Sequence, residues 1–263
     1  GDMDAGFSLA FTDGSKLDVI NAGNASGTHD ISVPASAGAE SVAITATNLA
    51  PTGLDFATDS TVYGVEYHTA SDFLADGLSM SFSASVGNGA STTSTYASDG
   101  HVAAGLTYVS DLGDTAITVG AGYSQSDGYK SGNQFTADDG GMHVGLSAVT
   151  GDLTVAVGFA DGDSVNGTTA QVDGEIMKAG VKYVSGDLTF NVGMTSSTAK
   201  DSTTTGTAGT TEDAYDKTSA SVSYVVASGV TAHIGYSDVD SQSEGTNDGK
   251  GGSAWYIGAN MSF

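Results

Sequence analysis

The stretch Trp255-Tyr256-Ile257-Gly258-Ala259-Asn260-Met261-Ser262-Phe263 alternates apolar and polar residues from end to end. Successive side chains of a β-strand point to opposite faces, so this period of two predicts a strand with one apolar and one polar face. The apolar set is Trp255, Ile257, Ala259, Met261 and Phe263. Helical periodicity, with apolar residues three and four apart, does not fit this stretch.

The same alternation recurs upstream and predicts thirteen strands in all. Most are about 8–10 residues long, the length that a tilted strand needs to cross a bilayer. Asp13-Gly14 separates the first two and is a strong hairpin signal. The expected strands are 6–12, 16–20, 61–68, 78–86, 101–109, 115–124, 141–149, 153–160, 175–184, 188–196, 218–226, 230–237 and 254–263.

The connections between these strands alternate in length. Tight turns rich in Gly, Asp and Ser are expected at 111–114, 150–152, 185–187 and 227–229. Long polar loops are expected at 87–100, 125–140, 161–174, 197–217 and 238–253. Short turns at one end and long loops at the other are typical of an outer-membrane barrel.

Aromatic residues on the apolar faces fall into two rows. One row lies where strands reach the short turns: Tyr67, Tyr108, Tyr183, Tyr224 and Phe263. The other lies near the long loops: Tyr123, Phe159, Tyr236 and Trp255. Two such rows, separated by Val, Ala, Ile and Leu, fit the two membrane–water interfaces. The competing explanation is that aromatic residues simply favour strands.

Composition excludes several classes of protein. The 263 residues include 31 Asp and Glu against 7 basic residues, all lysine, for a net charge of −24. A nucleic-acid partner is therefore not expected, because such binding needs a basic face. The absence of Cys excludes disulfides and thiolate metal sites. Apolar runs such as 224–227 are far shorter than the ~20 residues of a membrane helix.

The chain resembles a known family in two places. The terminal strand, ending in Phe263, is similar to the assembly signal of bacterial outer-membrane barrels. Residues 60–68 and 77–86 resemble the strands after the constriction loop of Gram-negative general diffusion porins of the alphaproteobacterial type. The resemblance implies a homotrimer in the bacterial outer membrane, in contact with lipids and lipopolysaccharide. It also implies a channel for passive diffusion of small hydrophilic solutes and ions, without enzymatic activity.

The expected fold is all-β, a single antiparallel transmembrane β-barrel over residues 1–263. Thirteen strands are an odd number, whereas bacterial single-chain barrels have an even number. We therefore expect a 16-stranded barrel whose first three strands are absent from this sequence. Residues 22–60 then take the place of the constriction loop that this family folds into the pore. The alternative counts 42–47 as a further strand and gives 14 strands.

The candidate constriction loop contains four acids and no Lys or Arg: Asp30, Glu40, Asp55 and Asp59. Carboxylates in a narrow passage attract cations, so the loop predicts a cation preference. The alternative is a surface loop whose acids are merely solvated. The other predicted pore-lining residues lie on polar strand faces: Lys16, Asp18, Glu66, His68, His143, Lys178, Lys182 and His233. The histidines lack metal-ligand spacing, so we interpret them as polar residues of the lumen.

No catalytic motif is present, and no cofactor is expected to be required. Acids in the predicted long loops form possible weak sites for Ca²⁺ or Mg²⁺, hard ions that prefer oxygen ligands. These acids are Asp138, Asp139, Asp161, Asp163, Glu212 and Asp213. The alternative function is a secreted acidic, calcium-binding, β-rich adhesin or surface-layer protein, which would stay dispersed without detergent.

Overall fold

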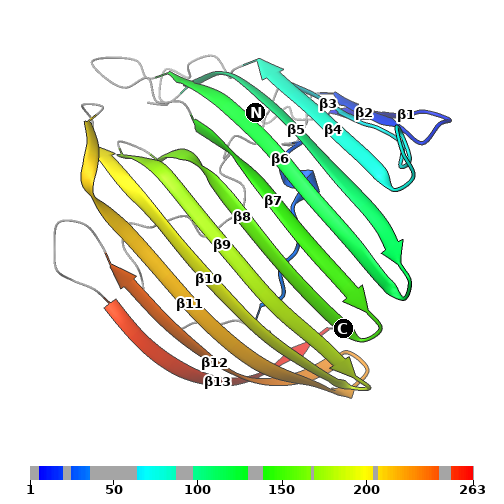
Figure 1. Cartoon of the computed structure of the whole chain (residues 1–263), viewed down its shortest axis with the longest axis vertical. Helices are drawn as coiled ribbons and strands as arrows, with labels where there is room; N and C mark the ends of the chain where they lie inside the picture. Colours follow the sequence, from blue (N-terminus) through cyan, green and yellow to red (C-terminus); the bar gives the residue numbers. More distant parts are fainter. Residues whose placement is uncertain are drawn as a thin grey trace.

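The computed structural model describes residues 6–19, 25–35, 64–86, 97–129, 139–166, 169–203, 207–242 and 250–262. They form one antiparallel sheet of 13 strands, in which each strand pairs with its neighbours in the sequence (Figure 1). The strands are β1 (Phe7–Ala10), β2 (Lys16–Val19), β3 (Gly64–His68), β4 (Leu78–Val86), β5 (Ala97–Leu112), β6 (Thr115–Tyr129), β7 (Asp139–Thr150), β8 (Leu153–Asn166), β9 (Thr169–Ser185), β10 (Leu188–Thr203), β11 (Thr207–Ala227), β12 (Val230–Gln242) and β13 (Lys250–Met261).

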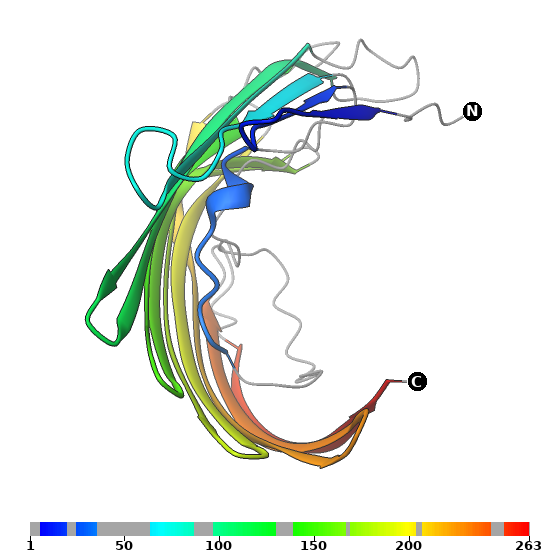
Figure 2. The same ribbon diagram turned by 90° about the vertical axis from the view of Figure 1, so that its right-hand side faces the viewer.

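The sheet curves strongly into an open trough (Figure 2). Among the described strands, β1 pairs only with β2 and β13 only with β12, so these two form the edges. The all-β antiparallel prediction is confirmed, with a strand at each of the thirteen expected places. Whether the closed barrel has 16 or 14 strands stays a prediction, because residues 42–47 lie outside the described residues.

The tight turns follow from their residues. Gly113 and Gly151 have φ of +67° and +54°, which an L side chain rarely adopts. Each is followed by Asp, and these pairs connect β5 to β6 and β7 to β8. We call this end of the sheet the short-turn end and the opposite end the long-loop end.

The strands extend further toward the long-loop end than the alternation predicted. β9 begins at Thr169 rather than near 175, and β11 begins at Thr207 rather than near 218. The prediction of long loops at 161–174 and 197–217 was therefore wrong over most of those residues. The physical reason is that the apolar alternation of the main part of each strand does not continue into these extensions. In the β9 extension the apolar positions shift by one residue, to Ala170, Val172 and Ile176, and in the β11 extension most residues are polar.

The distribution of apolar and polar residues over the sheet is the reverse of that in a soluble protein, which buries its apolar residues; we call this an inverted sheet. Its convex face carries large apolar residues that are widely exposed, including Val144 at 49% and Val192 at 52%. Its concave face is lined by small and polar residues such as His101 and Ser124, each 1% exposed. The described members of both predicted aromatic rows lie on the convex side, where Tyr108 and Tyr123 are exposed. Phe263 lies outside the described residues. The described part of the chain holds no helix with the length and apolar character of a membrane span.

Candidate functional site

Residues 25–35, which we call the inner segment, cross the concave side of the trough (Figure 2). The segment belongs to the connection between β2 and β3. It starts with a short 3-10 turn, η1 (Gly27–His29), and continues without regular secondary structure. Ala25 and Ile31 are buried against the concave face of the sheet, so the segment packs on the strands.

Glycines on the concave face make room for the inner segment. A Cβ at Gly120 would lie 2.2 Å from the carbonyl oxygen of His29, and one at Gly180 would lie 2.0 Å from that of Pro34. Neither distance is compatible with a side chain, so the backbone of the segment lies directly on that of the strands. Gly105, Gly145 and Gly193 are similarly close to the segment.

His29 is the central polar anchor of the inner segment. Its Nδ1 lies 2.7 Å from Oγ1 of Thr107, and its Nε2 lies 2.9 Å from Oγ of Ser81. Burial lowers the pKa of His29, and the nearby charges of His68 and His143 lower it further. Sequence reasoning missed His29, because a histidine inside an acidic loop carries no local pattern.

Asp30 forms a second anchor with His143 on β7. Asp30 Oδ1 lies 2.9 Å from Nδ1 of His143, and the carbonyl oxygen of Ser26 lies 3.0 Å from Nε2 of the same ring. Both partners accept hydrogen bonds, so the ring donates to both at once only as the imidazolium. His143 thus ties two points of the inner segment to the wall.

Four predicted lining residues on β2 and β3 form one cluster on the concave face. The pairing places Lys16 opposite His68 and Asp18 opposite Glu66. Asp18 Oδ2 lies 2.7 Å from Lys16 Nζ and 3.2 Å from His68 Nε2. Glu66 Oε1 lies 3.5 Å from the same nitrogen. Ser81 joins this cluster to His29, because its hydroxyl is also 2.9 Å from His68 Nδ1.

Lysines face the inner segment from the other side of the trough. Lys178 on β9 and Lys217 on β11 lie in register with Thr195 between them. With Val33, Pro34 and Ala35 they line a cavity of about 130 Å³. Lys217 was not predicted, because it fell in an expected loop. Lys182 lies farther toward the short-turn end, opposite Asn191.

His233 lies apart from the inner segment, on β12. It is buried on the concave face, and its ring centroid is 6.0 Å from that of Tyr256. Five other predicted site residues lie outside the described residues: Glu40, Asp55, Asp59, Asp138 and Phe263. Of the four acids in the candidate constriction loop, only Asp30 is therefore among the described residues.

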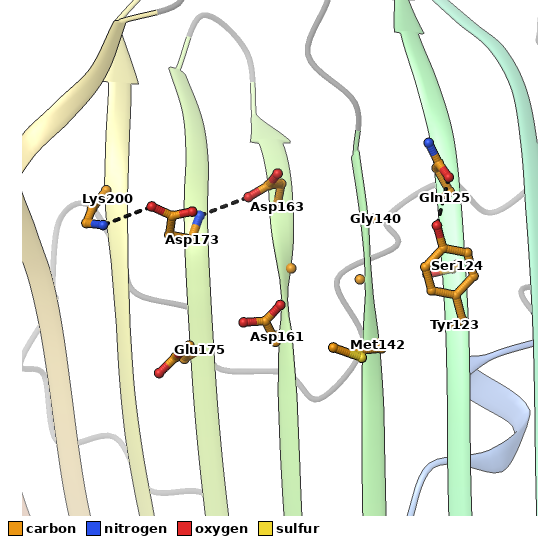
Figure 3. A pocket seen from close by; sticks show the side chains of 12 residues that line it. Tyr123, Ser124, Gln125, Gly140, Met142, Asp161, Asp163, Asp173, Glu175 and Lys200 are labelled. Atoms are coloured by element: carbon orange, nitrogen blue, oxygen red, sulfur yellow. Dashed lines mark hydrogen bonds and ion pairs between the residues drawn. The ribbon is translucent and has the colours of Figure 1, made fainter.

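The predicted metal-binding acids that the structure describes lie on strands, not in loops. Asp161 and Asp163 are on β8 and line a hollow of about 580 Å³ on the convex side (Figure 3). Asp163 Oδ1 accepts a hydrogen bond of 2.9 Å from the backbone N–H of Asp173, whose carboxylate lies 2.8 Å from Lys200 Nζ. These contacts use the carboxylates in hydrogen bonds and an ion pair.

The remaining acids of that set are dispersed. Asp139 begins β7, and Asp138 lies outside the described residues. Glu212 and Asp213 are on β11; Glu212 is exposed, and Asp213 is buried, at 1% exposure. Within the described ranges, no cluster of three or more His, Asp or Glu side chains is arranged to hold a metal ion. The Ca²⁺ or Mg²⁺ sites stay a prediction.

Solved structures of outer-membrane barrels are similar to this fold. A porin structure matches at 18% identity and a TM-score of 0.59, over 95% of this chain and 78% of its own. The trimer form of OmpT, an outer-membrane protein of Vibrio cholerae, matches at 14% identity and a TM-score of 0.52, over 94% and 76%. A loop-deletion mutant of OmpT matches at 16% identity and 0.52, over 94% and 75%.

The curved antiparallel sheet is similar in fold to these outer-membrane proteins. At these identities the similarity concerns the fold alone. No protein-family model matches the sequence, and no curated protein matches it significantly. The function therefore has to be argued from the site.

Proposed function

We propose that this chain is a porin, a water-filled channel in a bacterial outer membrane through which small hydrophilic solutes and ions diffuse passively. The observation that carries this proposal is the inverted sheet, with exposed apolar residues outside and a polar, partly obstructed inside. A convex apolar surface of this extent is unfavourable in water and favourable against lipid. The same surface would be unfavourable on a secreted adhesin, which is surrounded by water.

We assign the inner segment to the constriction of this channel. It lies in the connection where the resemblance to alphaproteobacterial porins places the constriction loop. Its anchors, His29 and Asp30, hold it across the concave face. The rest of the predicted constriction loop, residues 36–60, lies outside the described residues. A segment held in this way narrows the passage without closing it, and the function needs no catalytic residue.

We propose a weak to moderate cation preference. Asp18, Asp30 and Glu66 place carboxylates beside the passage, and the chain carries a net charge of −24. Lys178 and Lys217 oppose them, which limits the preference. Screening weakens with dilution, since the Debye length grows from ~10 Å at 0.1 M to ~30 Å at 0.01 M salt. The preference should therefore be strongest at low salt.

We further propose a homotrimer that contacts lipid and lipopolysaccharide, whose phosphates Ca²⁺ or Mg²⁺ would bridge to outer acids such as Asp161 and Glu212. The fold supports the trimer, because an OmpT structure of the same fold is of the trimer form. Phe263 remains the predicted assembly signal. These assignments follow from the porin proposal and fail with it.

The test is a planar-bilayer recording with the complete chain folded in detergent. We expect stepwise conductance and, under a KCl gradient, a cation-selective reversal potential that increases on dilution. A protein that stays monodisperse without detergent and gives no conductance would refute the porin proposal. Conductance with an anion-selective potential would refute the cation preference alone.

A further inference from the structure

The connection between β3 and β4, residues 69–77, differs from the other connections at the short-turn end. Those between β5 and β6, β7 and β8, and β9 and β10 are Gly-Asp pairs. The 69–77 loop instead carries Phe73 and Leu74, which are 51% and 72% exposed. It bulges from the convex side of the sheet, away from the lumen (Figure 2).

The loop is held in shape by its own hydrogen bonds. The backbone N–H groups of Asp72 and Phe73 donate to the carbonyl oxygen of Leu78, at 3.0 and 3.2 Å. The N–H of Leu78 donates to Ala75 at 3.0 Å, and the N–H of Gly77 donates to the carboxylate of Asp72. Backbone groups satisfied within the protein are what an apolar surrounding demands, because hydrocarbon offers them no partner.

The base of the loop is fixed to the neighbouring strand. The carbonyl oxygen of Gly77 accepts a hydrogen bond of 2.9 Å from Val109 on β5. A Cβ at Gly77 would lie 1.9 Å from the carbonyl oxygen of Val109, so the two backbones are in direct contact. The loop thus stands beside residues 109–112, where Leu112 is also exposed, and next to Tyr108 of the short-turn aromatic row.

We propose that the 69–77 loop is a lipid anchor that inserts Phe73 and Leu74 into the acyl region of the phospholipid leaflet at the short-turn end. This inference rests on the proposed porin function. It extends the apolar convex surface beyond the sheet through a preformed protrusion. The aromatic row beside it marks the depth at which acyl chains meet head groups.

Charge favours lipid over a second copy of the chain as the occupant. Asp72 and Asp76 flank the apolar tip, the neighbouring β5–β6 turn adds Asp114, and turns further along the same end add Asp152 and Asp187. A second copy docked through the same loop would bring its own Asp72 and Asp76 toward these carboxylates. A phospholipid with an ammonium head group offers the opposite charge at the level of Asp76 and hydrocarbon at the level of the tip.

The experiment uses spin labels, for which the absence of native Cys is an advantage. The variants Leu74→Cys, Val144→Cys and Asp187→Cys are labelled with a nitroxide in the complete protein, folded into phosphatidylethanolamine–phosphatidylcholine vesicles. Val144 lies on the convex face of β7, and Asp187 lies in a tight turn. A label that is accessible to dissolved oxygen lies in lipid. A label that is accessible to a water-soluble nickel chelate lies in water.

We expect the labels at Leu74→Cys and Val144→Cys to behave alike. Both should be highly accessible to oxygen and inaccessible to the nickel chelate. A Leu74→Cys label that matches Asp187→Cys, while Val144→Cys remains in lipid, overturns the anchor and leaves the porin proposal intact. A Val144→Cys label in water overturns the porin proposal itself. Dipolar broadening at Leu74→Cys that disappears on mixing with unlabelled protein would show a second copy at the loop, and would also overturn the anchor.

Discussion

The carboxylate of Asp30 lies 2.9 Å from Nδ1 of His143, and this pair joins the inner segment to the middle of the sheet. The ring faces a second acceptor, the carbonyl oxygen of Ser26, at 3.0 Å. The ring of His143 therefore contacts the inner segment at two points, one side chain and one backbone carbonyl. The position of the inner segment and the charge beside the passage are therefore set by the same contact.

We expect Asp30→Asn to reduce the cation preference, because it removes a carboxylate at the inner segment. The measurement is the reversal potential in planar bilayers at low salt. Glu212→Gln is the matched control, since Glu212 is exposed at the long-loop end of β11 and should have a smaller effect. Equal effects of the two variants would mean that net charge, and not position, sets the selectivity.

His29→Ala should loosen the inner segment. The variant removes the partner of Thr107 and one partner of Ser81, and losing buried hydrogen bonds of this kind costs about 1–3 kcal/mol. We expect noisier single-channel current and faster proteolysis at residues 25–35. His233→Ala is the control, because it removes another buried histidine of the concave face far from the segment. If both variants are equally noisy, His29 has no special anchoring role.

Acid should weaken the same anchor. The pKa of His29 is lowered from 6.5 on burial, so the docked ring binds fewer protons than a released one. Docking is therefore strongest above about pH 6.5 and weakens as the pH falls below it. We expect current noise to rise in that direction, and more so in Asp30→Asn, which lacks the carboxylate paired with His143. His29→Gln should reduce the pH dependence.

Gly180→Val should displace the inner segment, because the new Cβ would lie 2.0 Å from the carbonyl oxygen of Pro34. The neighbouring Ala179 points to the convex face, so Ala179→Val adds two methyl groups on the lipid side and serves as the control. We expect a changed conductance for Gly180→Val alone, with folded yield preserved in both. An unchanged conductance would place the segment elsewhere in the assembled channel.

Val119→Arg should impair assembly, whereas Thr118→Arg should be tolerated. Val119 belongs to the convex face and Thr118 to the concave face of β6. An arginine facing lipid near the bilayer midplane costs about 2–4 kcal/mol, and one facing water costs little. Heat-modifiable folded protein in outer-membrane fractions is the readout. Equal yields would contradict the inverted arrangement of the sheet.

Alternation was sufficient to predict the strands that lie between water and lipid. There the two faces of each strand differ, as in Val155 and Val157 against Thr154 and Ala156 on β8. Beyond the aromatic row at the long-loop end, this pattern is lost. The β11 extension is mostly polar and has no period of two, and in the β9 extension the apolar positions shift by one residue, to Ala170, Val172 and Ile176.

The residues that anchor the inner segment could not be predicted from the pattern of neighbouring residues in the sequence. His29 meets Ser81 and Thr107 only through the pairing of distant strands, and Lys217 fell in a predicted loop. One signal was present, although it was interpreted simply as a polar lumen. Gly105, Gly120, Gly145, Gly180 and Gly193 all occupy the polar faces of their strands, where the structure places the backbone of the inner segment.

The inverted sheet also has a consequence for how the protein travels. Its apolar surface exists only after the strands pair, because no continuous stretch of the chain is hydrophobic enough to halt in a bilayer. With a mean hydropathy of −0.05, the unfolded polypeptide resembles a water-soluble one. An unfolded chain of this kind can be transported across one membrane and through an aqueous compartment. It gains affinity for a second membrane only when its strands pair and form the apolar surface.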